Sequence, residues 1–225
     1  IRLSLVGSEM CIRDRDMTKH EKIQKITLTA ILAALVVVIA FLPIKTLGLE
    51  ITLTVIPIAI GAILGGPVVG LILGTVFGIV SFLQCLGYSP FGEVLFSIHP
   101  FLTFLVCVPT RMLAGWIPGL IYKIICKTGK KTLASGIACF LVPLLNTLFF
   151  MSVLVICFYN TEYIQSIALS LKATNPFTFV VLFVGINGLV EMLCGMFISF
   201  PISKTLDYAI SVSYTHLTLP TTERV

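Results

Sequence analysis

Six long apolar runs, separated by short polar connections, dominate the chain. Within each run the apolar residues are continuous rather than alternating with polar ones, which favours helices over half-buried strands. In a bilayer only helices and closed barrels satisfy their own backbone hydrogen bonds. Continuous runs of this length therefore predict an all-α membrane protein with six transmembrane helices. The predicted spans are residues 26–44, 51–64, 68–83, 101–122, 132–159 and 176–203.

Composition and charge support the same class. The 225 residues are 57% hydrophobic and only 11% charged, and the mean hydropathy is +1.08, which excludes an ordinary soluble domain. The net charge of +5 comes from lysines at the ends of the apolar runs, so it indicates membrane topology and no nucleic-acid partner.

The lysines also predict the orientation. Six spans place both ends of the domain on one side, together with the lysine-rich connection 123–131. Cytoplasmic loops carry the excess of basic residues, so both termini are predicted to be cytoplasmic. The terminal side holds Lys19, Lys22, Lys25, Lys123, Lys127, Lys130, Lys131 and Lys204, and the other side holds Lys45 and Lys172.

The two ends of the chain differ in composition from everything between them. Residues 1–16 and 211–225 resemble translated sequencing-adapter read-through, particularly in the strings SEMCIRDR and SYTHLTLPTT. We interpret them as an artefactual leader and tail and exclude them from reasoning about the fold. The expected six-helix membrane domain is residues 17–210, with Met17 as its first residue.

A single arginine lies in the middle of the fourth run. At about 1.5 Å per residue, Arg111 is roughly 15 Å from either side of a hydrocarbon core about 30 Å thick. Its insertion there costs about 2.5–3.5 kcal/mol on insertion scales, and arginine cannot escape the cost by deprotonation. Arg111 therefore requires an anion, an aqueous cavity, or both.

Three further polar residues are expected at a similar depth. Asn146 lies midway along span five, and Asn187 and Glu191 lie one helical turn apart in span six. One interpretation is a buried Arg111–Glu191 pair that fixes helix register. The other is a solute site in which Arg111 binds an anionic group, because its planar fork matches a carboxylate. Both stay open from the residues alone.

Two residues at the ends of apolar runs complete the candidate set. Gln84 begins the connection before span four, and His99 lies at the outer end of that span. We include both as candidate ligand contacts, although a lone histidine at such a position is more typical of a capping residue.

Enzyme and metal signatures are absent from the sequence. It contains no G-x-S-x-G or H-E-x-x-H motif, and its Gly129-Lys130-Lys131-Thr132 string lacks the leading glycine of a phosphate loop. The seven cysteines include no C-x-x-C pair, so they are interpreted as small buried apolar residues. We predict no enzymatic activity, no metal and no cofactor.

Small residues recur at four-residue spacing in two places. Ala30 and Ala34 form a small-x-x-x-small face in span one, and glycines at positions 66, 70, 74 and 78 do the same in and before span three. Such faces allow close helix approach. For the glycines we favour simple packing over a sliding surface.

The ordered blocks of the chain resemble a known family, the substrate-binding (S) components of energy-coupling factor (ECF) transporters, which take up vitamins in prokaryotes. The resemblance covers about residues 17–210. It is carried by the six spans, the alanine motif, and the blocks IPIAIGAILGGPVVGLILGTVFGIVSFLQCLG, VPTRMLAGWIPGLIYK and NGLVEMLCGMFISFPI.

The resemblance implies a multi-pass subunit of a prokaryotic plasma membrane that binds a vitamin from outside with high affinity. It would deliver this cargo to a transmembrane coupling protein and two ATPase subunits, which alone would use ATP. Ala30 and Ala34 match the positions where S components meet the coupling protein. The family's pocket lies between the outer halves of spans four to six.

The block QCLGYSPFGEVLFSIHPFLTFLVCVPTRMLAGW is most similar to pantothenate-type members, and Arg111 would suit the carboxylate of pantothenate. Two alternatives are a secondary transporter or facilitator that works without ATPases, and a membrane scaffold that transports nothing. The lack of an internal inverted repeat argues against the first.

Overall fold

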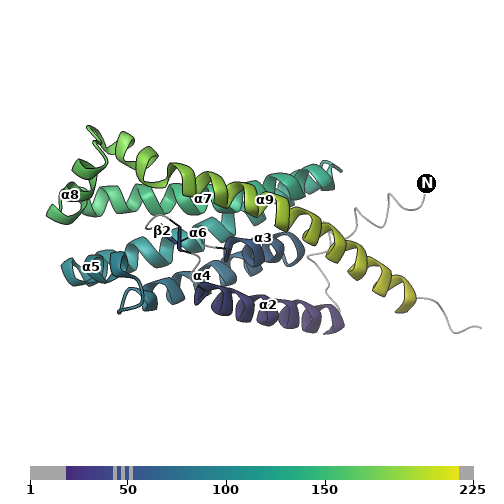
Figure 1. Ribbon diagram of the computed structural model, residues 1–225. Coiled ribbons are helices and arrows are strands. Elements are labelled where there is room, and N and C mark those ends of the chain that lie inside the picture. The colour runs from purple at the N-terminus through teal and green to yellow at the C-terminus, as the bar shows by residue number, and fades with distance from the viewer. Residues whose placement is uncertain (1–18, 43–44, 47–48, 51–52, 218–225) are drawn as a thin grey trace, which may run out of the picture.

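The computed structural model shows an elongated bundle of helices lying side by side (Figure 1). The structure describes residues 19–42, 45–46, 49–50 and 53–217. The predicted leader 1–16, Met17 and the last part of the predicted tail lie outside this range. Within it the prediction of an all-α protein is confirmed, apart from one two-residue antiparallel strand pair.

The elements follow one another as a series of long helices with short connections. They are α2 (Lys19–Ala40), β1 (Lys45–Thr46), β2 (Leu49–Glu50), α3 (Val55–Leu64), α4 (Pro67–Gln84), α5 (Pro90–Ile98), α6 (Pro100–Cys126), α7 (Lys131–Phe158), α8 (Glu162–Ser170) and α9 (Pro176–Leu217).

Five helices in the described part of the chain are long and apolar enough to cross a membrane: α2, α4, α6, α7 and α9. The second predicted span, 51–64, contains the shorter helix α3, whose ten residues extend about 15 Å. Helix α3 packs against α2, α4, α6, α7 and α9, and nearly all of its side chains are buried. It is therefore a core helix, enclosed by protein rather than by lipid.

Both longer connections contain a short helix. Helix α5 lies in the connection predicted at 84–100, and α8 in the one at 160–175. They lie at the same end of the bundle, opposite the end where α2 begins and α9 finishes (Figure 1). Only His99 separates α5 from α6, and it is extended, with φ −157° and ψ 97°. Pro100 explains this, because the residue before a proline is disfavoured in helical conformation.

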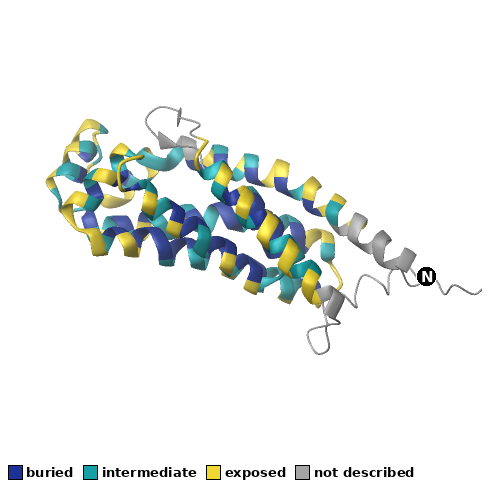
Figure 2. Ribbon diagram, turned by 90° about the horizontal axis from the view of Figure 1, so that it is seen from below, coloured by how far each residue is buried: buried dark blue, intermediate teal, exposed yellow. Residues whose placement is uncertain are grey.

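Buried residues lie on the inward helix faces and exposed ones on the outside (Figure 2). One hydrophobic cluster joins α2, α3 and α4, and a second joins α7 to α5, α8 and the start of α9. The second cluster fixes the two short helices over their end of the bundle. The outward apolar side chains that remain are those expected to face lipid.

The predicted glycine face packs directly against the backbone of α6. An added Cβ would overlap the carbonyl oxygen of Gly115 at Gly70 and that of Arg111 at Gly74, and at Gly78 it would lie 2.8 Å from the Val108 Cα. Gly66 is different, because it precedes α4 with φ 86° and has open space around it. Gly70, Gly74 and Gly78 therefore allow close helix packing, which is the interpretation favoured from the sequence, and Gly66 forms a turn.

Replacing Gly74 by alanine is expected to lower the thermal unfolding temperature, because the new methyl group overlaps backbone that cannot rotate away. Overpacking of this kind costs about 1–3 kcal/mol. Circular dichroism of the detergent-solubilised protein measures it. Gly136→Ala is the control, since its nearest neighbour would be the Phe200 ring at 3.7 Å. Equal unfolding temperatures for the two variants would contradict this packing.

Candidate functional site

Arg111 lies near the middle of α6 with its side chain enclosed by neighbouring helices. It is 8% exposed, and its backbone carbonyl faces Gly74 of α4. Because Gly74 has no side chain, α4 can approach closely enough to place Phe77, one turn further along, beside the guanidinium. The sequence expectation of a deeply buried arginine is therefore met in the structure.

Two aromatic rings flank the guanidinium. Its central carbon lies 4.7 Å from the centre of the Phe77 ring of α4 and 4.8 Å from that of the Phe150 ring of α7. Cations at this distance are attracted to the negative face of an aromatic ring, by about 2 kcal/mol or more when water is excluded. The rings therefore stabilise the charge without neutralising it.

The hydrogen bonds of Arg111 leave at least one N–H of its guanidinium able to bind a further acceptor. Nη1 donates to the backbone carbonyl of Cys107, one turn earlier on α6, at 3.3 Å. Nε is buried and has no hydrogen-bond partner within the described part of the chain. A buried donor of this kind carries a free-energy cost of roughly 1–3 kcal/mol until an acceptor binds it.

Asn146 and Glu191 are brought to the same region from two other helices. Both are 8% exposed. Asn146 is one turn before Phe150, so it shares the face of α7 that covers Arg111. Glu191 of α9 is near enough to exert a weak electrostatic influence on Arg111. We call Arg111, Phe77, Phe150, Asn146 and Glu191 the Arg111 cluster.

The register of α9 on α7 supports this placement of Glu191. A Cβ at Gly188 would lie 3.7 Å from the Thr147 side chain, and one at Gly195 would lie 3.1 Å from Pro143. Glu191 lies between these two contacts, at the level of Asn146. The side chain of Asn187, the remaining predicted member, lies outside the described residues.

Gln84 and His99 lie apart from the cluster. The Gln84 side-chain amide donates to the Ala40 carbonyl at 2.6 Å and so joins the ends of α4 and α2. His99 is exposed and lies twelve residues, or about 18 Å, from Arg111 along α6. Its carbonyl accepts hydrogen bonds from the backbone and the hydroxyl of Thr103. Their assignment as ligand contacts stays a prediction.

The two phenylalanines are the members that sequence analysis missed. Phe150 could have been found, because it follows Asn146 at helical spacing. Phe77 carried no such signal, since only the packing of α4 on α6 brings it to Arg111. Within the described residues no group of three or more His, Cys, Asp or Glu side chains could hold a metal ion.

The alanine pair of α2 faces outward. Leu32 and Val36 on the same helix are buried, whereas Ala30 and Ala34 are exposed. The larger apolar residues Ile26 and Val38 extend this outer face. It is thus an apolar surface on which two small residues leave room for close contact with a neighbour.

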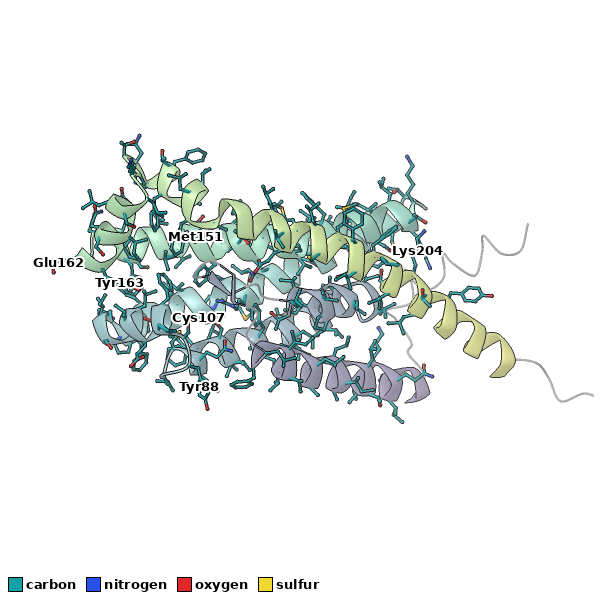
Figure 3. The ribbon with its side chains drawn as sticks, viewed as in Figure 1. Tyr88, Cys107, Met151, Glu162, Tyr163 and Lys204 are labelled. Carbon is teal, nitrogen blue, oxygen red and sulfur yellow. The ribbon has the colours of Figure 1, made fainter. Side chains whose placement is uncertain are left out.

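Charged residues mark the two ends of the bundle. Figure 3 shows Glu162 and Tyr163 at the end that carries α8, Lys204 towards the opposite end, and Cys107 in the interior. The backbone carbonyl of Cys107 accepts the hydrogen bond from Arg111. The cluster therefore lies between polar ends, within the apolar length of the helices.

Comparison with known proteins identifies the family. The family model for "ECF transporter, substrate-specific component" matches residues 24–203. The chain belongs to this family. It is therefore a transporter component and a multi-pass protein of the plasma membrane, and the resemblance drawn from its sequence is confirmed.

One curated relative is the "Pantothenic acid transporter PanT" of Lactococcus lactis subsp. cremoris. It is 28% identical over 181 residues, which cover 73% of this chain and 90% of the relative. The region matched by the family contains the whole Arg111 cluster and both alanines, so every candidate residue of this S component lies within the family domain.

A double-mutant cycle tests the contact between Arg111 and Phe150. Phe150→Leu is expected to destabilise the S component more in the native background than in Arg111→Met, with a coupling energy of about 0.5–2 kcal/mol. The unfolding midpoints of the four proteins in mixed micelles measure it. Phe140→Leu, at an exposed position of the same helix, is the control and should show no coupling. A coupling of zero for Phe150 would overturn the contact.

Proposed function

We propose that this S component binds pantothenate, or a closely related carboxylate vitamin or precursor, with high affinity and delivers it to an ATP-driven ECF module for import. The observation that carries the proposal is the buried Arg111 guanidinium, held by two rings and one carbonyl with its Nε still in need of an acceptor. The pantothenic acid transporter among its relatives supports the choice of ligand.

The chemistry of the Arg111 cluster suits a small carboxylate. A guanidinium pairs with a carboxylate through parallel hydrogen bonds, which are stronger than bonds between neutral groups. Asn146 is an amide on the same face, able both to donate to and accept from the hydroxyl and amide groups of pantothenate. Glu191 offsets the charge of Arg111 while the ligand is absent, and Asn187, one turn away on α9, is a further candidate contact.

We further propose six membrane crossings with both chain ends in the cytoplasm, in which the short, protein-enclosed helix α3 is the second crossing beside the five long helices. The first residues of α2 and the last of α9 lie at one end of the bundle (Figure 1). The lysine-rich connection between α6 and α7 lies at this same end of the bundle. The excess of lysines there favours the cytoplasmic side. Helices α5 and α8 would then lie at the outside, where the vitamin arrives.

We assign contact with the transmembrane coupling protein to the outer face of α2. Ala30 and Ala34 are exposed in an apolar surface, which is the arrangement needed for a transmembrane coupling protein to approach closely. The coupling protein and two ATPase subunits would complete the transporter, and ATP would be consumed by those partners alone. A secondary transporter would need neither this face nor the partners.

Replacing Arg111 by alanine is expected to abolish measurable binding of pantothenate. Removal of one partner of a buried charge pair costs about 2–5 kcal/mol, or roughly 30-fold or more in affinity. Ligand-dependent thermal stabilisation of the purified subunit measures the loss. Pantothenol, in which an alcohol replaces the carboxylate, is the matched ligand and should bind the native protein no better than it binds the variant.

Glu191→Gln distinguishes a ligand site from a pair that only fixes helix register. Retained folding with altered affinity or selectivity supports a site, whereas a variant that misfolds supports a structural pair. A screen of water-soluble vitamins that produces no stabilisation of the native protein with any of them would favour a scaffold.

Replacing Ala30 by tryptophan is expected to preserve pantothenate binding and abolish coupled uptake, because a large side chain on the small-residue face holds the coupling protein away. Uptake of labelled pantothenate by cells that express the whole transporter measures this, beside binding to the purified subunit. Ile156→Trp, at an exposed apolar position of α7, is the control and should transport normally. Normal transport by Ala30→Trp would refute the docking assignment.

A further inference from the structure

Two cysteines far apart in the sequence meet beside the Arg111 cluster. Cys85 is the residue directly after α4, and Cys107 lies on α6, 22 positions later. Their sulfur atoms are 3.9 Å apart and both residues are buried. Both are thiols rather than halves of a disulfide. Among the six cysteines that the structure describes, this is the pair whose sulfurs lie in contact.

The cysteine pair lies where helices α4, α5 and α6 meet. The Cys85 thiol donates to the Ser81 carbonyl at 3.3 Å, and Gly92 of α5 closes over it, since a Cβ at Gly92 would lie 2.6 Å from the sulfur. Phe82 and Phe96 complete an apolar shell around the two cysteines. A covalent bond here would tie the α4–α5 junction to α6.

The segment that follows Cys85 is exposed at the surface. Leu86 and Tyr88, one and three residues after Cys85, are exposed, and Figure 3 shows Tyr88 pointing outward while Cys107 points into the bundle. Cys85 is therefore the thiol of the pair that adjoins an exposed segment of the chain, where a small uncharged oxidant would arrive first. Cys107 lies about 10 Å along α6 from Pro100, the first residue of that helix, and is therefore further from this end of the bundle than Cys85 is.

Cys107 is also joined to the proposed binding residue. Its backbone carbonyl accepts the hydrogen bond from Arg111 Nη1, and the same stretch of α6 is held against Gly78 of α4. A disulfide requires its sulfurs to lie about 2.05 Å apart, so the two must approach by roughly 2 Å. Because α4 and α6 are already in backbone contact at Gly78, closing this gap is expected to shift the turn of α6 that contains Cys107, and with it the carbonyl that accepts the hydrogen bond from Arg111.

We propose that Cys85 and Cys107 form a reversible disulfide that locks the α4–α5 junction to α6 and weakens anion binding at Arg111. The effect on binding rests on the function proposed above, whereas the disulfide itself does not. It would make the S component sensitive to hydroperoxides at the outer side of the membrane.

The chemistry balances with a hydroperoxide as the oxidant. The Cys85 thiolate, having released its proton, attacks a peroxide oxygen, the O–O bond breaks, and a sulfenic acid and hydroxide form, the hydroxide taking up the proton as water. Cys107 then attacks the sulfenic sulfur, the S–S bond forms, and a second water leaves. Two thiols lose two electrons, and hydrogen peroxide is reduced to two molecules of water. A dithiol reverses the reaction by exchange.

The test uses the full chain in lipid nanodiscs, treated with hydrogen peroxide and digested without reductant. Mass spectrometry should find a peptide pair linked through Cys85 and Cys107, lost on addition of dithiothreitol and absent from Cys85→Ala and Cys107→Ala. Cys126→Ala, a buried cysteine at the other end of α6, is the control and should still form the link. Absence of the linked pair from the native protein would overturn the proposal.

The effect on binding is measured on the same samples. Oxidation should lower pantothenate affinity about tenfold, as expected for one weakened charge-assisted hydrogen bond, and dithiothreitol should restore it. Cys85→Ala should bind equally with and without peroxide. Equal affinity of the linked and reduced native proteins would refute the regulatory role.

A ligand-free measurement separates this proposal from the proposed function. The linked protein should unfold at a higher temperature than the reduced one, because the cross-link restricts the unfolded chain. If the reduced protein binds no vitamin, the proposed function fails, while the mass spectrum and the unfolding temperature still decide whether the lock exists. An unchanged unfolding temperature in fully linked protein would refute the lock.

Discussion

The close approach of α4 to α6 is the constraint on which the other features depend. Three glycines leave no side chain between the two backbones, so the helices touch at the level of Arg111 and on either side of it. The same contact places Phe77 on the guanidinium and Cys85 beside Cys107. A larger residue on this face would separate the helices and alter the cation contact and the thiol pair together.

A charge inside an apolar bundle is stable only when several weak contacts act together. Arg111 has two ring faces, one carbonyl and the electrostatic influence of Glu191. These contacts do not occupy all the N–H donors of the guanidinium, and Nε still lacks an acceptor in the described part of the chain. A binding subunit needs this balance, because a guanidinium fully paired within the protein would gain little from a carboxylate ligand.

The features assigned to binding and coupling lie on different surfaces of one bundle. The Arg111 cluster is enclosed by α4, α6, α7 and α9, whereas Ala30 and Ala34 lie on the outer face of α2. Helix α3 packs between them and contacts all of these helices. The Arg111 cluster and the proposed docking face are therefore connected by continuous packing through a buried core helix.

The sequence by itself determined the class of protein, the positions of the long helices and the depth of Arg111, because continuous apolar runs and a charge within one of them follow directly from the cost of exposing polar groups to lipid. It also carried enough ordered motifs to indicate the family. It did not show that α3 is a short core helix, or that helices α5 and α8 fill the connections. Only the tertiary structure decided which side chains meet: Phe77 reaches Arg111, and Cys85 reaches Cys107, through the register of α4 on α6. Register between helices depends on the packing of both surfaces at once, and a pattern along one segment does not contain it.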